Sequence, residues 1–474
     1  FANVAGVLAA TLAGLTLLIE LGLLVGWLAA GGDRPRALLF QYTAVMLPFM
    51  FTVCMLALGS AALQCRGRFA YPAFAPLILN ITLIVAAVWI APKLASADEG
   101  RFFVIAAAVV AAGIIQLVGV VWLLRRAGLA AVPTIRPLVP EVRRMIAMMA
   151  PMVLPLSVLQ LSAFGDRLIA LVLSGPAGHA WLPMRQGVVR CLYAANRLYQ
   201  LPLGVLAISV ATVVFPLFSR YASRDDKAGL RDAANRALRL GAFLAIPAGT
   251  ALILLARPLV TLFFQRGDFT EFDTDRSTRI LRMYCLGMGA YFWNHVLLRA
   301  FFAINDTRVP LRLAVALAPV NMVLVVAGVF TPLKGGAVGL ATALTQSANA
   351  LLLIFALKRR WGRLGGRRIA GSIARTALAT AVMAAALLAA AGWVVPPLKS
   401  RIGRIAPDAA GDTAALIVSV LVGAAAFLVA ARLLRCPELT ELLRRKALPA
   451  AGPAAAEAYN AMSKGSEEGD DDRR

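Results

Sequence analysis

Residues 102–124 read FFVIAAAVVAAGIIQLVGVVWLL, an apolar run that contains one amide, Gln116, and no charged side chain. A helix of this length covers the roughly 30 Å of hydrocarbon at the centre of a bilayer. Arg101 precedes the run and Arg125 and Arg126 follow it, as expected where a helix reaches the polar boundary of a membrane. The stretch therefore predicts a transmembrane α-helix.

Similar runs recur along all 474 residues, of which 60% are apolar and 15% charged. A soluble domain would carry about a quarter charged residues, and β-barrel strands would appear as short alternating segments. The predicted fold is all-α, a polytopic bundle of about twelve transmembrane helices. The expected spans are 4–30, 37–63, 72–92, 102–124, 146–173, 188–218, 236–264, 280–303, 311–332, 335–357, 369–395 and 412–434.

The net charge of +24 lies mostly in short connections between these runs. This distribution is typical of a membrane protein and argues against a nucleic-acid partner, which would require a basic face. Basic residues are concentrated in one alternate set of connections. We therefore expect this set of connections and both chain termini to be cytoplasmic. The set comprises 66–68, 125–144, 220–239, 308–312, 358–368 and 432–446.

Known catalytic motifs are missing from the sequence. It has five scattered cysteines without a CxxC pair, only two histidines, and neither a GxxxxGK[ST] loop nor an HExxH or GxSxG motif. Disulfide frameworks, zinc sites and ATP hydrolysis are therefore not supported. We expect a transport protein that is not an enzyme.

The connection 125–145 separates four spans from eight. A two-lobed transporter is expected to divide six and six, with two further helices appended, so two helices are expected to be missing before Phe1. After residue 436 the chain becomes amphipathic (ELTELLRRK), then rich in Ala and Pro, and it ends in SEEGDDDRR. Residues 436–474 are expected to form a disordered cytoplasmic tail.

Three stretches carry a family resemblance. They are GRFAYPAFAPLILNITLI (67–84), AANRLYQLPLGVLAISVATVVFPLFSR (194–220), and FFQRGDFTEFDT (263–274) followed by YCLGMGAYFWNHVLLRAFFAINDTRVP (284–310). Their order and spacing resemble the MurJ/MviN-type lipid II flippases of the multidrug/oligosaccharidyl-lipid/polysaccharide exporter superfamily. Family members usually have fourteen helices, and the alignment places residue 4 at the start of the third.

The resemblance implies a two-lobed, V-shaped architecture like that of the MATE transporters, with two extra C-terminal helices. Residues 1–126 would be the remainder of the N-terminal lobe, 127–145 a cytoplasmic linker, 146–357 the C-terminal lobe and 358–435 the accessory helices. The implied substrate is lipid II, the undecaprenyl-pyrophosphate-linked peptidoglycan precursor, moved to the outer leaflet of the bacterial inner membrane. Membrane lipids and the cell-wall synthesis machinery are further candidate partners.

Arg197 is the leading candidate for substrate binding, because it matches the family's cavity arginine. An arginine binds phosphate oxygens through two parallel hydrogen bonds and keeps its charge at working pH. The alternative is an arginine that extends to the membrane interface. Asn196 stands where relatives often have Asp, so a local Asp–Arg pair would be lost here.

Asp166 could be a sodium ligand, with Asn321 and Thr342 as oxygen donors, because some relatives bind sodium through an acidic residue of the matching helix. The second carboxylate expected on the 311–332 helix is replaced by Val325. The alternative is a structural ion pair of Asp166 with Arg167 or another helix. Beyond this candidate sodium ion, no cofactor is expected.

Three further charged or titratable residues lie in predicted spans, where such groups are costly and often functional. Glu20 would face the cavity or pair with an arginine of a neighbouring helix. His295 occupies a position where relatives often carry Lys, and would add positive charge to the cavity or hydrogen-bond between helices. Arg299, one turn later, could share either role.

Two other functions compete with lipid II translocation. One is a flippase for another undecaprenyl-linked glycan, such as an O-antigen or exopolysaccharide unit. The other is a truncated, non-transporting membrane scaffold, which predicts that charge reversal at Arg197 is harmless.

Overall fold

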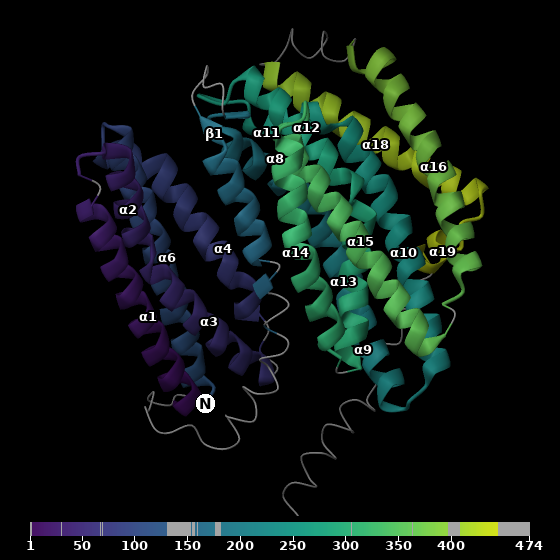
Figure 1. The fold of residues 1–474 in the computed structure, drawn as a ribbon, viewed down its shortest axis with the longest axis horizontal. Helices are drawn as coiled ribbons and strands as arrows, with labels where there is room; N and C mark the ends of the chain where they lie inside the picture. The colour runs from purple at the N-terminus through teal and green to yellow at the C-terminus, as the bar shows by residue number, and fades with distance from the viewer. Residues whose placement is uncertain are drawn as a thin grey trace, which may run out of the picture. The chain divides into compact units, whose positions relative to one another are not determined.

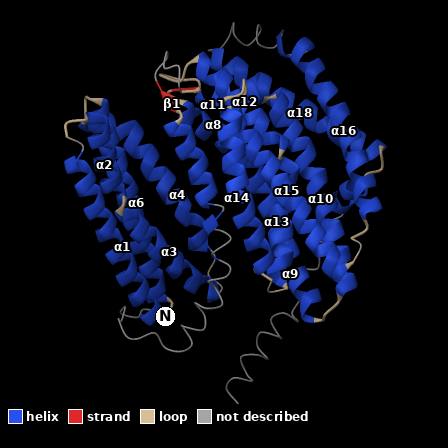
Figure 2. Ribbon diagram, viewed as in Figure 1, coloured by secondary structure: helices blue, strands red, loops and turns tan. Residues whose placement is uncertain are grey.

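The computed structural model of the protein describes residues 2–29, 31–66, 68, 70–129, 153, 157–158, 160–175, 182–304, 306–362, 364–396 and 408–443. Helices dominate these residues, and their one sheet is a short two-stranded pair (Figure 2). The chain divides into two compact units, unit 1 (Phe1–Met148) and unit 2 (Met149–Arg474).

Unit 1 is a set of helices gathered around α6 (Figure 1). Its elements are α1 (Ala2–Ala29), α2 (Arg34–Met46), α3 (Pro48–Cys65), α4 (Ala70–Val85), the π-helix η1 (Ala86–Ile90), α5 (Ala91–Leu94) and α6 (Asp98–Arg126). Helix α6 packs against α2, α3 and α4, and a small core of Leu56, Leu63, Ala75, Val120 and Leu124 lies between them. The predicted span 102–124 lies within α6.

The predicted span 37–63 contains two helices, because Pro48 begins α3. Proline lacks a backbone N–H, and its ring collides with the carbonyl four residues earlier in a continuous helix. The regular helical hydrogen bonding is therefore interrupted after Leu47, whose own backbone N–H still bonds to the carbonyls of Thr43 and Ala44. The two helices together remain long and apolar enough to cross a membrane.

Unit 2 contains the strand pair and the remaining described helices. They are β1 (Ser174–Gly175), β2 (Met184–Arg185), α8 (Val188–Pro202), the π-helix η2 (Leu203–Ala207), α9 (Ile208–Ser223), α10 (Lys227–Leu254), α11 (Ala256–Phe264), α12 (Glu271–Leu286), α13 (Met288–Ala303), α14 (Arg308–Val329), α15 (Gly336–Trp361), α16 (Gly366–Trp393), α18 (Asp408–Leu433) and α19 (Pro437–Leu443). Residues 160–172, which precede β1, are also helical.

Helix α10 is central to unit 2, where it packs against α9, α12, α13 and α16. Its burial is secured by polar contacts as well as apolar ones. The indole N–H of Trp293 on α13 donates to the carbonyl of Leu238 at 2.9 Å, and the amide of Asn235 donates to the carbonyl of Leu364 at 2.6 Å. Helices α16 and α18 pack on each other, and α16 lies against α10 (Figure 1).

Three predicted spans of unit 2 are wrong in their continuity, namely 280–303, 236–264 and 188–218. Span 280–303 is divided at Gly287, where an added Cβ would lie only 2.7 Å from the Cα of Ala343 on α15, so glycine alone permits this approach. Span 236–264 holds both α10 and α11. Helix α10 also begins earlier than predicted, at Lys227, because the Asp226 carboxylate accepts a hydrogen bond from the Gly229 N–H at 2.8 Å and caps it.

Nine helices among the described residues are long and apolar enough to cross a membrane, compared with the twelve predicted spans. Residues 146–152, 154–156 and 159 of the predicted span 146–173 lie outside the described residues. Span 280–303 is divided as described above, and 188–218 is interrupted by η2. A π-helical segment widens the turn and breaks the regular pattern of backbone hydrogen bonds.

The start of the predicted tail is ordered. Residues 437–443 form α19, and the Glu438 carboxylate in it is 1% exposed. It lies 2.9 Å from the guanidinium of Arg239 on α10 and accepts a hydrogen bond from the Ser372 hydroxyl on α16 at 2.8 Å. Residues 444–474 of the predicted tail lie outside the described residues. A buried, paired carboxylate attaches α19 to unit 2 and explains why this part of the prediction was wrong.

Candidate functional site

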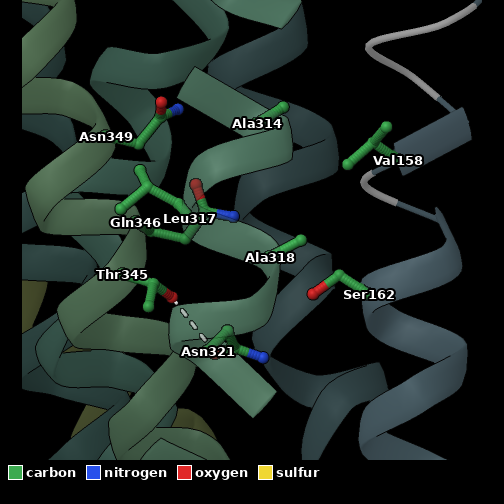
Figure 3. Close-up of a pocket in the computed structure, with 9 residues that line it drawn as sticks. All are labelled: Val158, Ser162, Ala314, Leu317, Ala318, Asn321, Thr345, Gln346 and Asn349. Carbon is green, nitrogen blue, oxygen red and sulfur yellow. Dashed lines mark hydrogen bonds between the residues drawn. The ribbon is translucent and has the colours of Figure 1, made fainter. Parts of the chain in front are cut away.

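A cleft between three helical segments of unit 2 is lined by small and polar side chains (Figure 3). It spans about 340 Å³ of empty space, part of which is open to solvent. The lining residues are Val158 and Ser162, then Ala314, Leu317, Ala318 and Asn321 of α14, then Thr345, Gln346 and Asn349 of α15. On both α14 and α15 they recur at the three- and four-residue spacing of one helical face.

Asp166 and Asn321 are joined at the base of this cleft. The Asn321 side-chain N–H donates to the Asp166 carboxylate at 2.7 Å, and both side chains are buried, at 4% and 7% exposed respectively. The Thr345 hydroxyl in turn donates to the Asn321 side-chain oxygen at 3.1 Å (Figure 3). Three helical segments that are distant in sequence are therefore connected through one amide.

Thr342 completes the predicted set of cation ligands. It lies one turn before Thr345 on α15, where its hydroxyl donates to the Val338 carbonyl at 2.8 Å and also interacts with the Asp166 carboxylate. The structure thus brings the three predicted residues together. Val325, at the position where a second carboxylate was expected, is fully buried.

The donor set of this cluster fits a monovalent cation. All its candidate ligands are oxygens, which hard cations prefer, and Asp166 supplies a single negative charge. Asp166 takes part in no ion pair among the described residues. The alternative raised from the sequence, an ion pair between Asp166 and Arg167, is therefore not observed. A buried carboxylate requires a proton or a cation. The side-chain oxygen of Asn349 is also buried, without a hydrogen-bond partner among the described residues.

A ladder of amides extends the cluster, and the sequence analysis missed it. The Asn294 N–H donates to the side-chain oxygen of Gln346 at 2.6 Å, and the Asn349 N–H donates to the Asn294 oxygen at 3.2 Å. The sequence does contain a signal for it. Thr342, Gln346 and Asn349 recur at helical spacing within an otherwise apolar span, which predicts a polar stripe facing another helix.

Arg197 lies on the exposed face of α8, whose opposite face is buried. Its guanidinium lies 4.9 Å from the centre of the Tyr193 ring, a cation–π contact between residues one turn apart. No ion pair joins Arg197 to a carboxylate among the described residues, which leaves its hydrogen-bond donors available. Asn196, beside it, is half-buried.

The other predicted substrate residues lie in two different places. His295 and Arg299 are half-buried and lie one turn apart on α13. Glu20, in unit 1, lines a mostly apolar groove between α1 and α2 together with Gln41. The sequence left open a hydrogen bond of the His295 ring and an ion pair of Glu20. Neither of them is found among the described residues.

The stretch FTEFDT builds a buried ionic cluster, which the sequence analysis also missed. Thr270 and Asp273 form a reciprocal capping box at the start of α12. The Asp273 carboxylate, 3% exposed, lies 2.6 Å from the Arg190 guanidinium on α8 and 3.8 Å from that of Arg276. The motif thereby fixes the first turn of α8 to the first turn of α12.

Comparison with known proteins decides the family. The family model described as "Lipid II flippase MurJ" matches residues 1–397. A protein of Rhizobium meliloti named "Probable lipid II flippase MurJ" is 32% identical over 410 residues, which covers 84% of this chain and 73% of that protein. The chain belongs to the lipid II flippase MurJ family.

Solved structures show the corresponding fold. A structure titled "Lipid II flippase MurJ, inward closed conformation" has a TM-score of 0.66 at 19% identity, covering 92% of this chain and 84% of that one. An inward-facing MATE family transporter of the MOP superfamily has a TM-score of 0.59 at 15% identity, covering 76% and 82%. This member of the MurJ family is therefore a multi-pass membrane protein with a helical bundle of the MATE type, and its role is transport.

Proposed function

We propose that the protein translocates lipid II from the inner to the outer leaflet of the bacterial inner membrane. The names of its relatives support this substrate, and so does the exposed cation Arg197. The head of lipid II carries a pyrophosphate and peptide carboxylates. Arg197 has no carboxylate partner among the described residues, so its guanidinium can offer these oxygens the bidentate hydrogen bonds that they accept.

The proposed mechanism is alternating access, in which two lobes rock around a central site. The anionic head would enter from the cytoplasmic side while its prenyl chain stays in lipid. An inside-negative membrane potential favours outward movement of the head by about 2.3 kcal/mol per negative charge per 100 mV. This orientation of the protein in the membrane requires both termini to be cytoplasmic, and the distribution of basic residues predicts that they are.

Sodium is the cation that Asp166, Asn321 and Thr342 would hold in this proposal. The bound ion would neutralise the buried carboxylate. To present its oxygen to the ion, the Asn321 amide would have to rotate, because its N–H now faces Asp166. The site would thus link the ion to the packing between α14, α15 and residues 160–172.

Complementation tests the proposed function. Cells depleted of their own lipid II flippase would express the chain or its Arg197→Glu variant at equal membrane levels. The wild type should restore growth, whereas the variant should not, because charge reversal repels the pyrophosphate.

Arg266→Glu is the matched control, since Arg266 is exposed and its side chain donates to the Leu262 carbonyl of its own turn at 3.5 Å, with no ion pair among the described residues. Equal rescue by Arg197→Glu would contradict a role for this cation and favour a scaffold. Rescue of a different glycan-lipid flippase mutant, but not of this one, would assign another undecaprenyl-linked substrate.

A further inference from the structure

A second pocket opens at the end of unit 2 that carries β1 and β2. It is open to solvent, spans about 940 Å³ of space that includes part of this solvent, and is formed by three segments: β2, one face of α12, and the turn between α14 and α15. Its lining includes Arg185, Arg276, Arg279 and Lys334. None of these residues belongs to the Asp166 cluster or lies on α8 with Arg197.

The lining of this pocket is cationic and contains no Asp or Glu. The carboxylate next to it is Asp273, which is shared between Arg190 and, at 3.8 Å, Arg276. Glu271 and Asp275 lie on the same helix, but Arg257 pairs with both.

Three cations of the pocket have no carboxylate partner among the described residues, namely Arg185, Arg279 and Lys334. Residues 176–181, which lie between β1 and β2 in the sequence, include no Asp or Glu. Like charges gathered in this way repel each other unless an anion lies between them.

The guanidinium groups are held in place before any ligand arrives. Arg276 donates to the backbone carbonyls of Gln186 at 3.1 Å and Arg185 at 2.9 Å, which fixes β2 against α12. The Phe272 ring lies 5.1 Å from the Arg185 guanidinium and 5.2 Å from that of Arg276. Strand pairing of Gly175 with Arg185 anchors the other side of β2. Fixed donors lose little conformational entropy on binding.

The third wall of the pocket adds positive potential. Gly335 and Gly336 belong to this wall, at the N-cap and the first residue of α15. The N-terminus of a long helix carries a partial positive charge. Lys334 holds a left-handed φ of 47°, a conformation that glycine adopts more easily, and its side chain is exposed at the rim.

We propose that Arg185, Arg276, Arg279 and Lys334 form a binding site for a phosphate or pyrophosphate group. Two guanidinium groups with fixed partners, an exposed arginine and an exposed lysine match the several oxygens of such an anion. The predicted topology places the pocket on the outer face of the membrane, within reach of lipid headgroups. The site does not depend on which lipid-linked glycan the protein carries.

Binding of inorganic pyrophosphate to the purified chain in a neutral detergent tests the site by titration calorimetry. The wild type should bind it saturably. The Arg279→Gln/Lys334→Gln variant should bind at least about tenfold more weakly, because it loses two charged donors. Added salt should weaken binding, since the pocket is open to solvent. Both side chains are exposed, so the variant should keep the unfolding temperature of the wild type.

Arg266→Gln, which removes an exposed arginine outside the pocket, is the control and should bind pyrophosphate as the wild type does. Unchanged binding by the double variant, loss of binding in Arg266→Gln, or an absence of saturable binding by the wild type would each overturn the proposal. Loss of the Arg197 function in cells would leave this result unaffected.

Lipid nanodiscs separate the two sources of phosphate. If phosphatidylglycerol nanodiscs suppress pyrophosphate binding and phosphatidylcholine nanodiscs do not, the natural occupant is an anionic lipid headgroup. If pyrophosphate binds equally in both, the occupant is a pyrophosphate carried by a substrate or dissolved in water. Either result supports the site.

Discussion

The two units of the molecule bury their helices to different extents. In unit 1, no part of the most apolar stretch of Ala2–Ala29 is buried. In Ala70–Leu94, 11% of the most apolar stretch is buried. In unit 2, the corresponding share reaches 44% in Lys227–Leu254. Helix α6, with 39%, is the one well-buried span of unit 1 among the described residues.

The contacts between helices differ in kind as well. The helices of unit 1 approach each other closely at small residues such as Gly113 and Gly119, and the Tyr71 hydroxyl donates to the Gln116 carbonyl at 2.7 Å. Unit 2 adds buried carboxylates, Asp166, Asp273 and Glu438, each with polar partners on another helix.

This difference indicates how each unit is stabilised. Lipid tails are as apolar as leucine, so apolar burial alone does not drive helices together inside a bilayer. Unit 1 relies on close packing and leaves most of α1 to its surroundings. Unit 2 depends on specific polar contacts, which should make it more sensitive to the removal of a charge.

Removal of the buried Asp273 carboxylate should have the largest effect. Asp273→Ala leaves Arg190 and Arg276 without their shared partner and removes a helix cap, so we expect a loss of about 3 kcal/mol in stability. Thermal unfolding in detergent would measure it.

Asp98→Ala in unit 1 is the matched variant. Asp98 is 83% exposed and pairs with Arg101 at 3.3 Å, an arrangement of little energetic value. Its unfolding temperature should equal that of the wild type. A similar decrease in both variants would contradict the proposed difference between the units.

A glycine comparison should give the next largest effect. In unit 2, a Cβ at Gly339 would lie 2.9 Å from the Ile280 carbonyl oxygen and 3.0 Å from the Tyr284 backbone N, neither of which can move independently. Gly339→Ala should therefore destabilise α12–α15 packing by about 2 kcal/mol.

Gly14→Ala in unit 1 provides the control, since no atom lies within 4 Å of its added Cβ. Alanine also favours helix over glycine, so this variant should unfold at the same temperature as the wild type or slightly above it. A clear loss of stability in Gly14→Ala would show that α1 is packed against another surface in the membrane.

The sequence predicts most helices well where charged residues mark both ends. The spans 102–124 and 369–395 correspond to α6 and α16 within a few residues. The break at Gly287 could not be predicted, because it depends on the approach of α15, which is distant in the sequence. The order in α19 was missed for the same reason, since Arg239 lies about 200 residues before Glu438.

The candidate site was predicted unevenly. Asp166 and Asn321 are 155 residues apart, so only the family resemblance, and no spacing, could join them. The polar stripe on α15 was visible in the sequence and was overlooked. The Asp273 cluster was hidden, because its carboxylate reads as one of several charges at an ordinary helix start.

The smallest expected effect is the stabilisation of the protein by sodium. It should depend on the buried polar group of unit 2 and not on that of unit 1. If Asp166 helps to hold the ion, sodium should stabilise the wild type by about 1.4 kcal/mol at ten times its dissociation constant. Thermal unfolding in sodium chloride, compared with choline chloride at equal ionic strength, would show this as a higher unfolding temperature. Asp166→Asn should abolish the difference between the two salts.

Gln116→Leu is the control in unit 1. The Gln116 side chain is buried and donates to the Ala75 carbonyl at 2.5 Å, so its removal should lower the unfolding temperature in both salts equally. The sodium-dependent increase should persist in this variant, because its site lies in unit 2. If Asp166→Asn retained the increase, the ion would bind elsewhere, and the buried Asp166 carboxylate would instead be neutralised by a proton.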